Sequence, residues 1–67
     1  MDFKIKGEYI DLLQLLKATG IASTGGLASM FVEDGMVKVN GEVESRKRRK
    51  LRPGDLVHVE GQEVHLS

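Results

Sequence analysis

The spacing of apolar residues along the chain changes twice, and each pattern predicts a different kind of element. In Phe3–Lys6 apolar and basic residues alternate, which is typical of a half-buried strand. From Tyr9 the apolar residues recur at helical spacing, so a first helix is predicted that ends before Gly20. A second helical pattern, "LASMFVED", covers residues 27–34.

The two predicted helices each have one apolar face. Tyr9 begins the stripe of the first helix, and Asp11 is expected in its first turn, where an acidic side chain is favourable. Leu27, Met30 and Phe31 form the apolar face of the second helix. These faces predict two helices that pack on a shared core.

Beyond Gly35 the apolar residues follow a period of two, which predicts strands. Val37 and Val39 precede Asn40-Gly41, and an Asn-Gly pair between alternating segments is a strong hairpin signal because both turn positions need positive φ. A further strand is predicted at residues 56–59, and residues 63–67 can add an edge strand. The expected fold is therefore α+β, with two short helices packed on a small, mainly antiparallel sheet.

The length and composition of the chain limit what it can be. Its 67 residues correspond to one small domain, residues 1–67, which leaves little room for a deep catalytic cleft. The chain has no cysteine, no apolar signal sequence at its start and no apolar stretch of membrane-spanning length. We therefore expect a cytoplasmic monomer without a membrane partner.

The net charge of zero conceals a strong separation of charge. Ten basic and ten acidic residues balance overall, but residues 46–52 ("RKRRKLR") contain six of the basic ones and no acid. The other sixty residues carry four basic and ten acidic side chains. Such a concentrated patch can recruit a polyanion while the acidic remainder limits unspecific binding. This basic segment is predicted to lie on the connection between two strands of the sheet. Its members are Arg46, Lys47, Arg48, Arg49, Lys50 and Arg52.

The order of these motifs resembles a known RNA-binding family. "G-x-V-x-V-N-G" at Gly35–Gly41 is followed by "K-L-R-P-G-D" at Lys50–Asp55, after two short helical segments. This arrangement over residues 9–61 resembles the S-four RNA-binding domain (the αL motif), in particular its small stand-alone bacterial branch. The resemblance implies a non-catalytic protein that binds structured RNA, namely ribosomal RNA or a ribosome-assembly intermediate.

The resemblance also implies that RNA meets the start of the second helix, at Thr24, Gly25 and Gly26. Many members of the family carry a basic residue where this chain has Gly25, and another beside the alanine, where this chain has Ser29. The two glycines could let a phosphate approach the free N–H groups of the helix start. Alternatively, Ser23 or Thr24 is an ordinary N-cap and the glycines only permit the bend.

The basic segment is the stronger candidate for the RNA contact. Its four arginines and two lysines could neutralise about four to six phosphates. Lys38 on the predicted hairpin could contact the sugar-phosphate edge, or it is simply an outward strand residue. The three aromatic side chains (Phe3, Tyr9 and Phe31) are expected to pack in the core, so structured RNA read by its shape fits better than stacked single strands.

Other chemistry finds little support in the sequence. His58 and His65 lie in separate predicted strands without clustered carboxylates, so no metal site is expected. No nucleophile–histidine spacing and no phosphate-binding loop with a lysine is present, so we expect no enzyme, cofactor or small-molecule substrate. Two alternatives stay open: a module that binds duplex DNA, and a module that docks an acidic protein through the basic segment.

Overall fold

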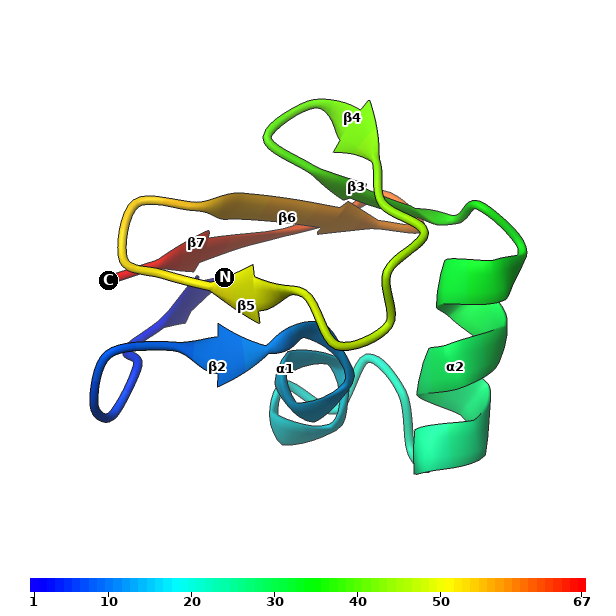
Figure 1. Cartoon of the computed structure of the whole chain (residues 1–67), viewed down its shortest axis with the longest axis horizontal. Coiled ribbons are helices and arrows are strands. Elements are labelled where there is room, and N and C mark those ends of the chain that lie inside the picture. Colours follow the sequence, from blue (N-terminus) through cyan, green and yellow to red (C-terminus); the bar gives the residue numbers. More distant parts are fainter.

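The computed structural model describes all 67 residues, which form two helices and two β-sheets (Figure 1). The larger sheet has the strand order β1-β7-β6-β3-β4, and its pairs are antiparallel except for β1 and β7. A second, two-stranded sheet pairs β2 with β5 antiparallel. The predicted α+β class with a mainly antiparallel sheet is thus confirmed. The elements are β1 (Asp2–Phe3), β2 (Ile10–Asp11), α1 (Leu12–Ala18), α2 (Gly25–Glu33), β3 (Val37–Val39), β4 (Glu42–Val43), β5 (Lys50–Leu51), β6 (Leu56–Val59) and β7 (Gln62–Leu66).

The core lies between the larger sheet, the small sheet and the two helices. In the view of Figure 1, α1 lies below the small sheet and α2 stands at the right-hand end of the molecule. Fourteen buried apolar residues form one cluster, with leucines from α1 and valines from β3, β6 and β7 at its centre. Alternate residues of these strands, such as Lys38 and His58, face solvent, while the valines between them are buried. The alternation of apolar and polar residues in the sequence therefore corresponds to strands with one buried face, as predicted. Neither helix is long and apolar enough to cross a membrane.

The first helix begins three residues later than the apolar spacing predicted. Asp11 is its N-cap and accepts a hydrogen bond from the backbone N–H of Gln14 at 2.9 Å, so it is not part of the first turn. Ile10 and Asp11 instead pair with Leu51 and Lys50 in the small sheet. The prediction that Tyr9 packs on the helix stripe is wrong, because its side chain is 45% exposed.

The buried face of the second helix agrees with the predicted one only in part. Ala28 and Val32 are fully buried, whereas Met30 is exposed and Phe31 and Leu27 are half-buried. Small Ala28 and Val32 follow each other at a spacing of four residues, so they form the line of closest approach to the core. The expected face was therefore correct for Leu27 and Phe31 but wrong for Met30.

The last strand is not an edge strand. β7 lies between β6 and β1, because the beginning of the chain pairs with it in parallel. Beyond β1, the backbone N–H of Ile5 donates to the carbonyl of Ser67 at 2.8 Å, and Ile5 is buried. The predicted strand at Phe3–Lys6 is thus shifted to Asp2–Phe3, and its pairing joins the two ends of the chain, which local sequence patterns cannot reveal.

The predicted hairpin turn at Asn40-Gly41 is confirmed. Both residues have positive φ, 53° and 87°, as this turn requires. The Asn40 side chain also accepts a hydrogen bond from the backbone N–H of Leu56 and donates one to Asp55, both at 3.0 Å. A second turn with the same signs of φ joins β6 and β7, but there Glu60 (φ 48°) occupies the first position.

This comparison between the two turns leads to a prediction about stability. Glu60→Asn should raise the free energy of unfolding by about 0.5–1 kcal/mol, because asparagine tolerates the left-handed conformation better than glutamate. Urea unfolding at pH 7 measures the difference. Glu60→Gln, which removes the charge but keeps the unsuitable side chain, should leave stability unchanged. An equal gain from both substitutions would show that charge, and not conformation, limits the turn.

Candidate nucleic-acid interface

The basic segment, residues 46–52, has a fixed backbone. The first N–H groups of α1 have no partners within the helix, and two of them bond to this segment. Leu12 donates to the carbonyl of Arg49 at 3.0 Å, and Leu13 donates to that of Lys47 at 3.3 Å. Lys50 then enters β5, which pairs with β2 (Figure 1). The segment was predicted to be a connection between two strands. In the structure its last part forms strand β5, and the carbonyls in its middle part cap the start of α1.

A buried carboxylate lies at the base of this segment. Glu44 is only 5% exposed and is the one charged residue among fifteen buried residues. Its carboxylate accepts hydrogen bonds from the backbone N–H of Arg46 at 2.8 Å and from its Nε and Nη2 at 3.1 and 3.0 Å. Arg49 Nη1 donates to the same group at 2.8 Å. We refer to these three residues as the Glu44–arginine cluster.

The hydrogen bonds of this cluster determine the charge state of Glu44. Those from the Arg46 side chain favour the ionised form most, and they lower the pKa of Glu44 to about 2 although burial opposes this. The carboxylate is therefore ionised at neutral pH and stays paired with both guanidinium groups. Two arginines of the basic segment are thus held in defined positions before any ligand binds.

The other cations of the segment are less constrained. Lys47 pairs with Glu33, and Arg48 lies 3.6 Å from the Asp11 carboxylate while its side chain is 78% exposed. Lys50 and Arg52 make no ion pair. Three carboxylates thus contact four of the six cations, so the group keeps a net charge of +3.

Four of the six cations line a concavity on the surface, and their side chains are suited to bind anions. It has a volume of about 580 Å³, and its lining contains no apolar side chain. Such a hollow offers guanidinium and ammonium donors from several directions, as recognition of phosphate oxygens requires. Its lining residues are Arg46, Arg48, Arg49 and Lys50.

The start of α2 lies apart from the basic segment. Thr24 is the N-cap of α2, and its hydroxyl accepts a hydrogen bond from the backbone N–H of Leu27 at 3.0 Å. Gly25 and Gly26 form the first turn, whereas Lys47 contacts Glu33 at the other end of this helix. Eight residues of helix separate the two places by about 12 Å. The structure therefore does not bring Thr24, Gly25 and Gly26 into the concavity.

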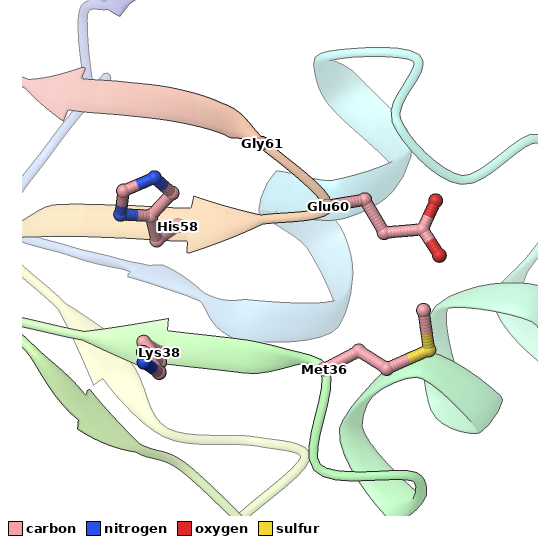
Figure 2. A pocket seen from close by; sticks show the side chains of 5 residues that line it. All are labelled: Met36, Lys38, His58, Glu60 and Gly61. Atoms are coloured by element: carbon pink, nitrogen blue, oxygen red, sulfur yellow. The ribbon is translucent and has the colours of Figure 1, made fainter.

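Lys38 faces away from the Glu44–arginine cluster. It is the outward residue of β3, opposite Val43 of β4 and His58 of β6. Figure 2 shows Lys38 and His58 on neighbouring strands, beside a shallow pocket of about 210 Å³. Glu44 follows Val43 and points to the buried face, so the two charged side chains leave the hairpin on opposite sides.

Two residues that belong to these sites were not identified from the sequence, Lys17 beside the start of α2 and Glu44 at the base of the basic segment. Lys17 of α1 lies beside Gly25, since a Cβ atom on that glycine would be 4.0 Å from the Lys17 side chain. Glu44 could have been found from the hairpin register, because a two-residue turn at Asn40-Gly41 pairs Lys38 with Val43 and so turns Glu44 inward. Lys17 is joined to α2 only by tertiary packing, and no local pattern signals that. No cluster of three or more metal-ligating side chains comes together.

The Glu44–arginine cluster leads to a prediction about acid stability. The pKa of Glu44 is lower in the folded chain than its ordinary value of 4.5, so its contribution to stability is complete above about pH 4.5 and is lost as pH falls through about 2. Glu44→Gln should lower the free energy of unfolding by about 1–3 kcal/mol at pH 6, because Arg46 and Arg49 lose a charged acceptor. The deficit should shrink towards pH 2. Urea unfolding across this range measures it, with exposed Glu42→Gln as control; a deficit independent of pH would contradict the assignment.

Comparison with known proteins agrees with this architecture. The model of the S4 domain family matches residues 3–67. "Probable ribosome maturation protein RlbA" of Bacillus subtilis (strain 168) is 42% identical over 57 residues, which cover 85% of this chain and 80% of that protein. YbcJ of Escherichia coli (strain K12) is 38% identical over 61 residues, which cover 91% of this chain and 87% of YbcJ.

Solved structures show the same fold. The solution structure of E. coli YbcJ, described as revealing an αL (ALFAL) motif involved in RNA binding, superposes with a TM-score of 0.75 at 36% identity and covers 97% of this chain and 84% of that one. The 30S ribosomal protein S4e of Thermoplasma acidophilum shares the fold at 20% identity, with a TM-score of 0.73 over 87% of this chain and 31% of that one. The predicted resemblance is therefore confirmed, and this chain belongs to the S4 domain family, among its small αL-motif proteins similar to YbcJ and RlbA.

Proposed function

We propose that residues 1–67 act as a single, non-catalytic RNA-binding domain in the cytoplasm, which grips structured RNA by its sugar-phosphate backbone. The observation that carries this proposal is the basic segment held in place by Glu44. The RNA that we assign to it is ribosomal RNA or a ribosome-assembly intermediate. This assignment is supported by two relatives, the probable ribosome maturation protein RlbA and YbcJ, whose structure contains a motif involved in RNA binding.

The arrangement of the arginines favours binding to phosphate. Arg46 is bound to Glu44 through Nε and Nη2, yet its side chain is 73% exposed, so Nη1 can still donate outwards. Arg48, Lys50 and Arg52 reach solvent with their charged groups largely free. Since the backbone of the segment is already fixed, RNA binding costs little ordering of the chain.

The remaining predicted contacts are assigned a secondary part. Thr24, Gly25 and Gly26, with Lys17 beside them, can form a second backbone contact on a long RNA, about 12 Å along α2 from the Lys47–Glu33 ion pair. Lys38 lies on the other face of the sheet and would contact only RNA that passes around its edge. Most of the affinity is therefore attributed to the basic segment.

A salt series tests the proposal. The triple variant Arg48→Gln, Lys50→Gln, Arg52→Gln removes three cations that do not bond to Glu44. For a structured RNA hairpin, its affinity at 0.1 M salt should fall by about tenfold or more, and its plot of log affinity against log salt should be flatter by about two to three, because each phosphate contact contributes about 0.9. Lys38→Gln should change affinity much less. Fluorescence anisotropy with an end-labelled RNA measures both quantities.

A DNA hairpin of the same sequence is the control that shows whether the protein prefers RNA to DNA. The unchanged protein should prefer RNA, because only RNA offers 2′-hydroxyl groups and the A-form groove. Equal affinity for both would place the protein among duplex-DNA binders. Negligible binding at low salt, or unchanged binding by the triple variant, would refute the proposed role of the basic segment and direct the search to an acidic protein.

A further inference from the structure

Tyr9 is an exposed aromatic residue at the border of a third concavity. In the small sheet Ile10 points inward opposite buried Leu51, so Tyr9 and Asp11 point outward on the same side as Lys50. The hollow beside the tyrosine has a volume of about 370 Å³, within the range of about 300–1,000 Å³ that is typical of small-molecule sites. We call it the Tyr9 pocket; it is lined by Phe3, Lys4, Lys6, Tyr9, Ile10 and Gln14.

The lining of the Tyr9 pocket combines an apolar floor with a positive rim. Phe3 and Ile10 are half-buried and belong to the periphery of the core. Lys4 and Lys6 carry the only charges of the lining, and Gln14 offers both a donor and an acceptor of hydrogen bonds. A flat apolar group that is attached to a negative charge matches this surface.

Lys50 connects this pocket to the basic segment. Its ammonium group lies 4.9 Å from the centre of the Tyr9 ring, a cation–π contact, and the same residue lines the concavity of the basic segment. Tyr9 therefore contacts the basic segment through Lys50 and at the same time lines the pocket. A chain of phosphates along the basic segment would therefore pass directly beside this ring.

From these observations we infer that the Tyr9 pocket receives the base of one unpaired nucleotide of the RNA that the basic segment holds. The base stacks on Tyr9, Gln14 hydrogen-bonds to its edge, and Lys4 and Lys6 contact the flanking phosphates. This inference rests on the proposed RNA-binding function. It adds a preference for RNA with a bulge or an unpaired end, which backbone contacts alone cannot provide.

The chain is well suited to a direct test, because Tyr9 is its only tyrosine and it has no tryptophan. Protein with ¹³C-labelled tyrosine is titrated with an RNA hairpin that carries a one-nucleotide bulge, and with the same hairpin fully paired. Stacking should shift the Tyr9 ring signals upfield with the bulged RNA only. Backbone amide signals of the basic segment should shift with both RNAs.

Binding measurements on variants complete the test. The bulged hairpin should bind about fivefold or more tightly than the paired one, in keeping with the energy of stacking one base on an aromatic ring. Tyr9→Phe should keep this preference and Tyr9→Leu should abolish it, while affinity for the paired hairpin stays the same. Arg52→Gln, the control within the basic segment, should weaken binding of both hairpins equally.

The possible failures are distinct. If both hairpins shift the basic segment but the Tyr9 ring signals stay unchanged, or if Tyr9→Leu keeps the preference, the pocket does not bind a base although the proposed function stands. If neither hairpin binds, the proposed function fails and the inference fails with it.

Discussion

The arrangement of this protein depends on one buried carboxylate. Glu44 joins the end of a hairpin to Arg46 and Arg49, and so fixes the start of the basic segment against the sheet. From there the carbonyls of Lys47 and Arg49 reach the free N–H groups of α1. An isolated buried charge would be costly, but here the charge is matched by several short hydrogen bonds. These hydrogen bonds hold residues 46–50 of the basic segment in place, although none of these residues has an apolar side chain that could anchor it in the core.

This arrangement reconciles a neutral chain with a strongly basic surface. Six cations so close together repel one another, and three carboxylates offset part of that repulsion: Glu44 directly after β4, Asp11 at the end of β2 and Glu33 at the end of α2. Glu33 and Asp11 pair with Lys47 and Arg48, whose side chains are 41% and 78% exposed. A competing phosphate could therefore replace these two acids at little cost, because ion pairs of exposed cations contribute little. Glu44 is different, because its burial keeps it bound to the arginines. The acids thus stabilise the free protein and leave the outward donors available.

Much of this could be predicted from the sequence, and the exceptions have physical reasons. Alternating valines and the Asn-Gly turn determine β3 and β4, because such signals are local. The start of α1 was misplaced because β2 forms only through pairing with β5, some forty residues away. Tyr9 was assigned to the core by helical spacing and lies outside because that spacing does not apply there. The basic segment was recognised from charge alone, whereas its orientation depends on Glu44, whose inward position follows from hairpin register.

The most direct measurement compares the RNA affinity of Glu44→Gln with that of Glu42→Gln. Both variants gain one unit of positive charge within two residues of each other, but Glu42 makes no ion pair, so it controls for charge. If Glu44 orients the arginines, Glu44→Gln binds a structured RNA more weakly than the unchanged protein at the same salt, while Glu42→Gln binds as well or better. If both variants bind equally or more tightly, positive charge alone determines affinity, and the role assigned to the Glu44–arginine cluster is wrong.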